Sequence, residues 1–367
     1  MEKWSKDKAW DWYNSRPWIR GFNGYPSNCV NRVAIWQSYK HEEVFKQIEY
    51  EFSLAEKTGL NAVRAIPMFE VWLYEHDSFM NNLEEYISLA EKYGLGVMLV
   101  IGNDCNVPKD FYTFRLGEQN IDWGYHSGIK RGQHSATHTA AGYQLNDEPE
   151  YTEKFYDMVR ELAEKYHADK RVQIWNVWNE IGNSRRGMMS AEMMKKSFEI
   201  IRSFNQIQPL TADCWCYDAD MQPFKEEQLL ALELSDVISF HYYGIFQNMV
   251  RVIKNLKERY DRPLINDEWL NRIEHNNVDE IFPLFWLEKI GSYHWGLIQG
   301  YSQTYEPWGC YMKDIENPDY HGDFDFTKWQ HDLYRFNGLP YIAKEVKIIK
   351  DFAALADKEF ESKKKIK

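Results

Sequence analysis

Short apolar runs alternate along the chain with longer segments that have helical apolar spacing. An apolar run of a few residues is typical of a buried strand, and apolar residues three and four positions apart are typical of an amphipathic helix. The pattern predicts strands over residues 18–23, 60–66, 95–101, 171–180, 209–214, 236–243, 263–268 and 293–299. It predicts helices over residues 41–57, 79–93, 150–166, 191–204, 224–234, 247–260, 278–289 and 341–355. Strands and helices therefore follow one another in turn along most of the chain.

One junction between a helix and a strand occurs twice. Residues 55–63 read A-E-K-T-G-L-N-A-V, and residues 90–98 read A-E-K-Y-G-L-G-V-M. In both segments a glycine stands where the helix ends, which is a common helix stop. We interpret the repetition as the rhythm of a βα unit, which predicts a parallel sheet.

Eight such units without a compositional linker predict one domain over residues 1–367, a single (β/α)8 TIM barrel of the α/β class. The charged end of the chain, at about residues 358–367, is expected to fray. A doubly wound open sheet is the alternative fold. However, no G-x-G-x-x-G follows the first predicted strand and no phosphate-binding loop is present, so we expect neither NAD nor ATP nor another cofactor.

Two long segments interrupt the rhythm, at residues 103–147 after the third strand and at residues 301–325 after the eighth. The first segment is polar and rich in glycine, histidine and aromatic residues, which favours an ordered functional wall over disorder. It holds His126, and its His134 and His138 have the spacing of metal ligands on a helix. No acidic residue or cysteine has a matching spacing, so we expect no metal site.

Composition narrows the function. The net charge is −12, from 44 basic and 56 acidic residues, which argues against a nucleic-acid partner. Aromatic residues make up 16% of the chain, with 15 Trp and 24 Tyr, and such side chains suit stacking on sugar rings. The five cysteines form no C-x-x-C pair, which argues against a zinc ribbon or a redox motif, and free thiols fit a reducing compartment.

The first ten residues, M-E-K-W-S-K-D-K-A-W, contain no apolar segment of the kind that a secretory signal needs. No apolar run approaches the roughly 18 residues of a membrane helix. We therefore expect a cytoplasmic protein without a membrane partner. A secreted protein is the alternative if the natural chain begins earlier.

Two of the predicted strands end on a glutamate. Residues 171–180 read R-V-Q-I-W-N-V-W-N-E and end on Glu180, and residues 263–270 read P-L-I-N-D-E-W-L, with Glu268 at the strand end. Active sites lie at the carboxyl ends of barrel strands, and strands four and seven face each other across the barrel. Two carboxylates there can act on a glycosidic bond, at about 5–5.5 Å apart for retention and about 6.5–9.5 Å for inversion. Glu180 alone could also be an exposed strand end, and strand alternation allows only one of Asp267 and Glu268 to face the mouth.

The segments N-V-W-N-E-I-G-N-S, at residues 176–184, and P-L-I-N-D-E-W-L resemble the acid/base and nucleophile segments of clan A glycoside hydrolases, the superfamily of family 5 cellulases and mannanases. The resemblance covers nearly the whole predicted barrel, with the segments in the same order and at the same strand ends. An arginine on strand two and an aromatic residue on strand six add to it. It implies a (β/α)8 enzyme that hydrolyses O-glycosyl bonds.

The resemblance implies a role for each matching residue. Glu180 is expected to be the general acid/base and Glu268 the nucleophile. Asn179 would hydrogen-bond the sugar 2-hydroxyl, an interaction that strengthens in the transition state. Arg64 would keep the nucleophile ionised, because an adjacent cation lowers the pKa of a carboxyl group. A surface salt bridge at the rim is the alternative for Arg64.

His241 and Tyr243 lie two positions apart on strand six and so share a face. In the family pattern these two residues orient the carboxylates, whereas a buried structural histidine is the alternative for His241. Further candidates for the sugar site are the floor residue, which is either Trp295 or Trp308, and Trp215, Trp269 and Gln303 as parts of its wall.

The leading hypothesis is a retaining glycoside hydrolase that cleaves β-linked or arabinofuranosyl oligosaccharides by double displacement. The two long loops favour a closed pocket, and hence an exo-acting enzyme or one for short oligosaccharides. A carbohydrate-binding barrel without turnover is the second hypothesis, and a metal-dependent hydrolase that uses the loop histidines is the third.

Overall fold

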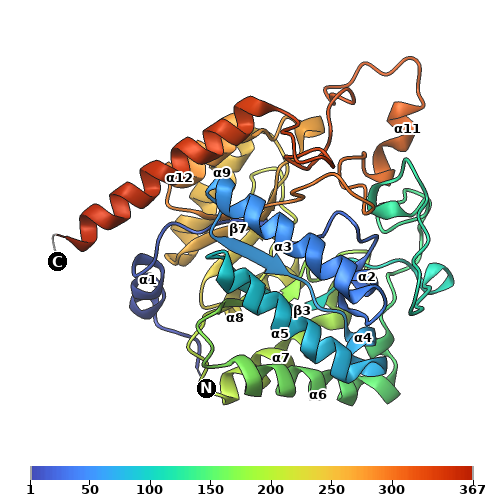
Figure 1. Cartoon of the computed structure of the whole chain (residues 1–367), viewed down its shortest axis with the longest axis horizontal. Coiled ribbons are helices and arrows are strands. Elements are labelled where there is room, and N and C mark those ends of the chain that lie inside the picture. The colour runs from blue at the N-terminus through green and yellow to red at the C-terminus, as the bar shows by residue number, and fades with distance from the viewer. Residues whose placement is uncertain (1, 366–367) are drawn as a thin grey trace.

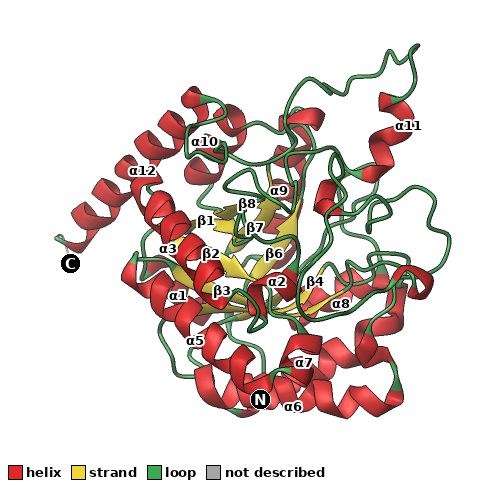
Figure 2. Ribbon diagram, turned by 45° about the vertical axis from the view of Figure 1, so that its right-hand side comes forward, coloured by secondary structure: helices red, strands yellow, loops and turns green. Residues whose placement is uncertain are grey.

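The computed structural model describes residues 2–365, and residues 1, 366 and 367 lie outside the described part. Parallel strands lie at its centre and helices surround them (Figure 2). The strands are β1 (Arg20–Asn23), β2 (Ala62–Ala65), β3 (Gly96–Asn103), β4 (Val172–Asn179), β5 (Leu210–Ala212), β6 (Ile238–His241), β7 (Leu264–Trp269) and β8 (Gly291–His294). The helices are α1 (Lys6–Asn14), α2 (Arg32–Trp36), α3 (His41–Thr58), α4 (Phe69–Tyr74), α5 (His76–Lys92), α6 (Pro149–Tyr166), α7 (Ala191–Ser203), α8 (Glu226–Leu234), α9 (Phe246–Tyr260), α10 (Val278–Leu287), α11 (Met312–Ile315) and α12 (Ala343–Lys364).

The sheet closes on itself. Its eight strands pair in the order β5-β4-β3-β2-β1-β8-β7-β6. The two strands at the ends of this order meet through a parallel bridge between Cys214 and Phe240, and the backbone N–H of His241 donates to the Cys214 carbonyl at 2.8 Å. The predicted (β/α)8 barrel is therefore confirmed.

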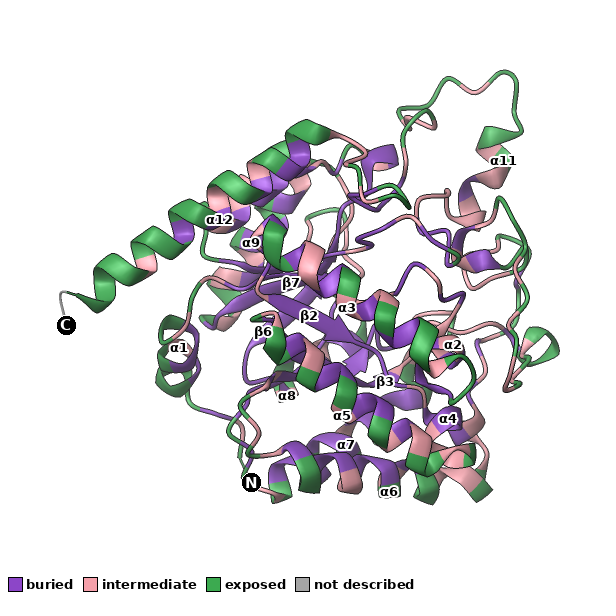
Figure 3. Ribbon diagram, in the orientation of Figure 1, coloured by how far each residue is buried: buried purple, intermediate pink, exposed green. Residues whose placement is uncertain are grey.

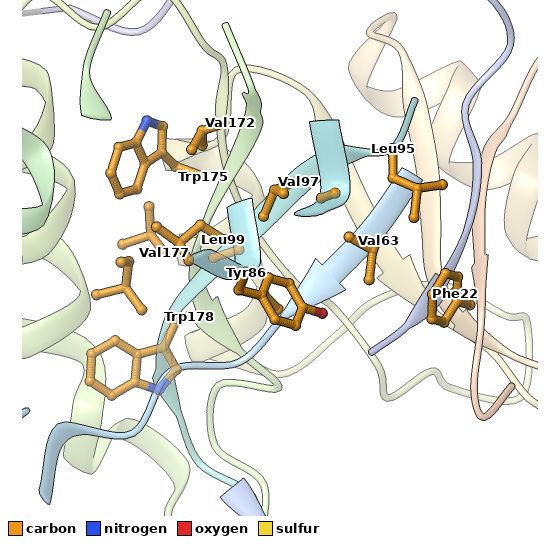
Figure 4. Packing of buried hydrophobic residues seen from close by; sticks show 14 of the residues in the cluster. Phe22, Val63, Tyr86, Leu95, Val97, Leu99, Val172, Trp175, Val177 and Trp178 are labelled. Carbon is orange, nitrogen blue, oxygen red and sulfur yellow. The ribbon is translucent and has the colours of Figure 1, made fainter. Parts of the chain in front are cut away.

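The outer layer of the core lies between the strands and the helices. On β4, Trp175, Val177 and Trp178 are buried and point away from the barrel interior, as Figure 4 shows. Trp178 packs against Phe155 of α6 at a ring distance of 5.9 Å. Each large apolar side chain buried in this way contributes roughly 1.5–3 kcal/mol. The surrounding helices turn their exposed residues outward and their buried residues toward the strands (Figure 3).

The repeated helix–strand junction has the predicted form. Gly59 after α3 has φ 88° and Gly94 after α5 has φ 67°, in the left-handed region that glycine adopts without steric cost. The N–H of each glycine donates to a carbonyl of the last helical turn, that of Glu56 and that of Glu91 respectively. The two glycines therefore end their helices and direct the chain into β2 and β3.

The amino-terminal end of the barrel is filled by apolar side chains and closed by α1. Buried inside it are Ile19, Ala62, Met98, Ile174, Val237, Ile265 and Tyr293. Trp12 and Tyr13 of α1 belong to the same cluster. Helix α1 was not predicted from the pattern, although Ser5 caps it by accepting the Lys8 N–H at 3.2 Å.

Two other elements differ most from their predicted boundaries. β8 shares only two residues with the strand predicted over residues 293–299, since it begins at Gly291 and the chain turns at Gly296, where φ is 72°. The last helix, α12, does not end at Leu355 but continues to Lys364, so residues 358–364 of the expected frayed tail are helical.

Two long segments lie over the carboxyl end of the strands, residues 104–148 after β3 and residues 295–342 after β8, which includes α11 (Figure 1). Trp123 and Tyr301 pack together at a ring distance of 5.9 Å, which joins one segment to the other. No helix within residues 2–365 has the length and hydropathy that crossing a membrane requires.

Candidate active site

The side chains predicted to do chemistry lie together at the carboxyl end of the barrel. Glu180 directly follows β4, and Glu268 is in β7. Both glutamates are nearly buried, with 8% and 6% of their surface exposed. Around them lie Arg64 of β2, Asn179 of β4, His241 of β6 and Tyr243 just after β6.

Both strands that carry the glutamates have an irregular register at their ends. On β4 the register shifts between Asn176 and Trp178, so that Trp178 packs outward against α6 and Asn179 turns toward the mouth. On β7 it shifts between Asn266 and Trp269. Such irregularities are frequent at barrel rims, where they re-aim side chains. They explain why simple alternation does not describe these strand ends.

The backbone of Glu180 is held in an unusual conformation. Its φ is 46°, a left-handed value that costs of order 1–3 kcal/mol for a residue with a side chain. The buried Asp104 stabilises the turn that follows, because its carboxylate accepts from the Gly182 N–H at 2.7 Å, the Trp178 indole at 3.0 Å and Arg186 Nε at 3.0 Å. Asp104 was not predicted from the sequence, although it directly follows β3, where functional residues are expected.

Three side chains donate to the Glu180 carboxylate. His241 Nδ1 lies 2.7 Å from its Oε1, Cys105 Sγ lies 2.8 Å from its Oε2, and Asn183 Nδ2 also donates to Oε2. Burial raises the pKa of Glu180, but the hydrogen bond and charge of His241, together with Cys105 and Asn183, bring this pKa below its ordinary value. Burial raises the pKa of the Cys105 thiol well above its ordinary value, so that the thiol remains a donor.

Glu268 has a different set of donors. Arg64 Nη1 donates to its Oε1 at 2.7 Å, the Tyr243 hydroxyl donates to its Oε2 at 2.8 Å, and His241 Nδ1 lies 3.4 Å from Oε2. Burial raises the pKa of Glu268, while the charges of His241 and Arg64 oppose that rise. The predicted pairing of Arg64 with Glu268 is present in the structure.

Arg64 has no exposed surface, so it is not a salt bridge at the rim. Its Nη2 donates to Asn179 Oδ1 at 2.5 Å and to Asp213 Oδ2 at 3.1 Å, its Nη1 also donates to Asn23 Oδ1 at 2.9 Å, and its Nε lies 3.4 Å from Asp267 Oδ2. The guanidinium group of Arg64 on β2 therefore contacts side chains from four other strands or their ends.

Two buried aspartates, Asp213 and Asp267, lie below the glutamates. Asp213 follows β5, and Asp267 precedes Glu268 on β7. His241 Nε2 lies 3.3 Å from Asp213 Oδ2 and 3.4 Å from Asp267 Oδ1. From the sequence, Asp267 was considered only as the neighbour of Glu268. Asp213 was not predicted, although its position at the end of strand five was a usable signal.

The pKa values of His241, Asp267 and Asp213 are shifted in different directions. Burial lowers the pKa of His241, but the charges of Glu268, Asp267 and Asp213 outweigh it and hold this pKa well above its ordinary value. Burial and the charge of Asp213 raise the pKa of Asp267 to about 7. Burial also raises the pKa of Asp213, but His241 and Arg64 bring it well below its ordinary value.

The acidic side chains come close enough together to ligate a cation. In the group Glu180, His241 and Glu268, one candidate atom from each residue lies within 4.8 Å of the others. The same holds for the group Asp213, His241 and Asp267. Arg64 lies against carboxylates of both groups, so the chain itself supplies positive charge at this position.

Of the two candidate floor residues, Trp308 lies beside the side chain that holds the nucleophile candidate. Its ring meets the Tyr243 ring edge-on at 5.0 Å and stacks on His134 at 5.0 Å. Trp295 follows β8 and packs against Tyr25 at 5.8 Å. Both tryptophans are partly exposed.

The remaining wall candidates have different surroundings. Trp215 is partly exposed, and its indole donates to the Ile181 carbonyl at 3.0 Å, next to Glu180. Trp269 is fully buried and packs against Phe285 of α10 at 5.4 Å. Gln303 is fully buried as well, and its amide accepts from the Gly124 N–H at 2.6 Å and donates to the Asp122 carbonyl at 2.9 Å. Gln303 thus joins the two long segments.

The loop histidines do not gather around acidic ligands. The ring centres of His126 and His134 lie 5.7 Å apart, and both rings pack against Trp308. His138 lies near the carbonyl groups of Arg131 and Gly132. Within residues 2–365, neither metal-compatible group of side chains includes a loop histidine.

Comparison with known proteins gives the family. The sequence profile of the cellulases, glycosyl hydrolase family 5, matches residues 22–283, which include both glutamates. No curated protein matches the chain in sequence.

Several solved structures share the fold. An endo-β-1,4-mannanase from Thermotoga petrophila is 14% identical, with a TM-score of 0.57 over 94% of this chain and 78% of that chain. A family 5 mannosidase from Rhizomucor miehei is 12% identical, with a TM-score of 0.56 over 94% and 95%. An exo-β-1,4-mannosidase from Opitutaceae bacterium strain TAV5 is 15% identical, with a TM-score of 0.57 over 94% and 60%. The profile covers most of the barrel and both strand ends that carry the glutamates, and the chain is therefore a glycosidase that belongs to glycosyl hydrolase family 5.

Proposed function

We propose that the chain hydrolyses β-linked oligosaccharides with retention of configuration, by double displacement. The observation that carries this proposal is the spacing of the glutamates, since an oxygen of Glu180 and an oxygen of Glu268 lie within 4.8 Å. Retaining enzymes hold their carboxyl groups about 5–5.5 Å apart, whereas inverting enzymes need about 6.5–9.5 Å to admit a water molecule.

In the first step, the Glu268 carboxylate attacks the anomeric carbon and the bond to the leaving oxygen breaks. Glu180 gives its proton to that oxygen. In the second step, Glu180 takes a proton from water, the water oxygen bonds to the anomeric carbon, and the bond to Glu268 breaks. Asn179, held by Arg64 at 2.5 Å, is the proposed partner of the sugar 2-hydroxyl.

The pKa of Glu180 is lowered and that of Glu268 is raised, which are the opposite directions from those that favour the first step. Burial is the largest influence on both groups and raises both pKa values. A sugar that covers the site deepens this burial. Arg64 and Tyr243 donate to Glu268 and not to Glu180, and these two contacts favour the negative charge on Glu268.

The long segments support action on chain ends or on short oligosaccharides. Residues 104–148 and residues 295–342 are joined through Gln303 and through the stacking of His134 on Trp308. Trp308 in turn lies against Tyr243, next to the nucleophile candidate. A wall so close to the reacting bond favours a pocket over a cleft that is open at both ends.

The sugar is proposed from the relatives. The similar structures include both an endo-β-1,4-mannanase and an exo-β-1,4-mannosidase, so β-1,4-linked mannosides are the first substrates to test. A panel of aryl β-mannosides, β-glucosides, β-galactosides, β-xylosides and α-arabinofuranosides identifies the sugar. Manno-oligosaccharides then separate the two modes, because an exo-acting enzyme releases one sugar at a time from a single end. Early appearance of intermediate-length products, or no turnover across the panel, would count against the proposal.

A further inference from the structure

The imidazole of His241 joins two layers of carboxylates. Its Nδ1 faces Glu180 at 2.7 Å and Glu268 at 3.4 Å. Its Nε2 faces Asp213 at 3.3 Å and Asp267 at 3.4 Å. An imidazole can offer a proton at both nitrogens only in its charged form. The carboxylates on its two sides therefore both favour an imidazolium.

The charges of the site balance only with one further proton. In the state that the proposed function requires for its first step, Glu180 is protonated and Glu268 is ionised. Arg64 and His241 then carry two positive charges, while Glu268 and two ionised aspartates would carry three negative ones. Arg64 and both aspartates have no exposed surface, and an uncompensated buried charge is costly. One proton on the aspartate pair removes the imbalance.

The surroundings of the pair suit a shared proton. Asn176 Nδ2 donates to Asp213 Oδ1 at 2.7 Å and to Asp267 Oδ2 at 2.9 Å, so one amide holds both carboxyl groups. Oxygens of the two aspartates lie within 4.8 Å of each other. Among the described residues, the buried Asp267 Oδ1 has no hydrogen-bond partner. Two carboxyl groups in one buried site do not both ionise readily, and the pKa of Asp267, raised to about 7 by burial and by Asp213, agrees with this.

We propose that Asp213 and Asp267 share one proton beneath His241, and that this pair is a positioning device that keeps His241 charged against both catalytic glutamates. Neither aspartate contacts the reacting bond, since both act through His241. The other titratable or charged groups around the imidazole and the pair are Arg64 of β2, Glu180 after β4, Cys214 and Tyr217 after β5, Glu268 of β7 and Tyr293 of β8.

The test is a double-mutant cycle with Asp213→Asn, Asp267→Asn and the double variant. In either single variant the remaining aspartate gives up the shared proton, and the pair keeps its single negative charge. We expect each single variant to lower kcat/KM at pH 6 by less than about tenfold, and the double variant to lower it by on the order of 1,000-fold, far more than the product of the two. The profile of the parent enzyme should change near pH 7, where the second carboxyl group ionises, and this change should be absent from both single variants.

Three outcomes would overturn the proposal. They are a single variant as damaged as the double variant, a double variant equal to the product of the singles, and a change near pH 7 that persists in both single variants. A purely structural role of the aspartates gives multiplicative losses and leaves the pH profile in place.

Infrared spectroscopy tests the shared proton without any need for turnover or for the double variant to fold. At pH 6, each single variant should lose the carbonyl stretch of one protonated carboxyl group relative to the parent. A single variant that keeps every protonated-carboxyl band of the parent contradicts sharing. If the parent enzyme hydrolyses no glycoside of the panel, the proposed function fails while the infrared result still decides on the aspartate pair.

Discussion

The two ends of the barrel are built on the same strands but hold opposite kinds of side chain. On β2, Ala62 lies in the apolar cluster at the amino-terminal end of the barrel, here called the lower end. Arg64 lies among carboxylates at the carboxyl end, here called the upper end. On β7, Ile265 and Asp267 make the same change. Side chains two positions apart on a strand point to the same side. On both β2 and β7, therefore, one inward position is apolar and the next inward position is charged.

The two ends of the barrel therefore have different roles, one in stability and the other in chemistry. The lower end is an apolar core closed by α1, which favours folding and holds the strands in place. At the upper end, buried charges compensate one another, and such clusters contribute little net stability. Substitutions at the lower end should therefore reduce stability, whereas those at the upper end should first reduce activity.

The largest effect is expected from Glu268→Ala. Loss of the nucleophile should lower kcat by about 10⁴-fold or more, without a lower melting temperature, because a buried carboxylate is removed. Azide should restore turnover of an activated aryl glycoside, since it fits the space that the side chain leaves. Glu42→Ala, on the exposed surface of α3, is the matched control. Near-normal activity of the Glu268 variant would remove Glu268 from the mechanism.

Arg64→Met should reduce both activity and stability, because it leaves several buried carboxylates without their cation. We expect kcat/KM to fall by about 100-fold or more and the free energy of unfolding to fall by about 3–5 kcal/mol at pH 7. Urea unfolding at pH 7 and at pH 5 checks this, with a smaller loss at pH 5, where carboxyl groups take up protons. Arg259→Met, on the surface of α9, should stay within about 0.5 kcal/mol of the parent. An equal loss at both pH values would contradict the electrostatic explanation.

Ile265→Ala tests the lower end of the same strand that carries Glu268. Ile265 is fully buried in the cluster that α1 closes. Its truncation should lower the free energy of unfolding by about 2–5 kcal/mol and change kcat by no more than a few-fold. Urea unfolding and kinetics at a temperature where the variant is folded measure the two effects. A large drop in kcat with normal stability would break the proposed division of labour.

The smallest effect is a change in the pH dependence of stability. Because the pKa of Asp267 is raised to about 7 in the folded chain, the stability that its proton provides is full below its unfolded pKa of about 3.9 and is lost as the pH rises through 7. Between these two pKa values, the titration of Asp267 lowers the free energy of unfolding by about 1.4 kcal/mol per pH unit. Asp267→Asn should flatten the decrease by this amount in urea unfolding between pH 5 and pH 7. An unchanged slope would show that Asp267 is not protonated in the folded state.

Most of the fold could be predicted from the sequence, because the signals for its helices and strands are local. Apolar runs, helical spacing and two stop glycines at residues 59 and 94 are enough to place the βα units. Helix α1 was missed because its apolar residues close the barrel rather than cover the sheet, outside the βα rhythm. β8 was placed too late because Gly291 and Ser292 read as turn residues, although small side chains suit a crowded barrel interior.

For the site, the residues that follow the family pattern could be predicted, and Arg64, His241 and Tyr243 do surround the two glutamates. Partners from outside that pattern, such as Cys105, were missed. The place of Gln303 depends on how two distant segments meet, which local sequence does not specify. Alternation alone would separate Asp267 from Glu268, but the shift in register at the end of β7 brings both toward His241.

The anomeric configuration of the first product tests directly whether hydrolysis proceeds by double displacement at Glu180 and Glu268. Proton NMR can follow hydrolysis of an activated aryl glycoside by the parent enzyme during the first minutes, before the free sugar mutarotates. The spacing of Glu180 and Glu268, within 4.8 Å, predicts that the sugar is released first with the configuration of the substrate. Initial release of the opposite anomer would contradict double displacement at these two glutamates.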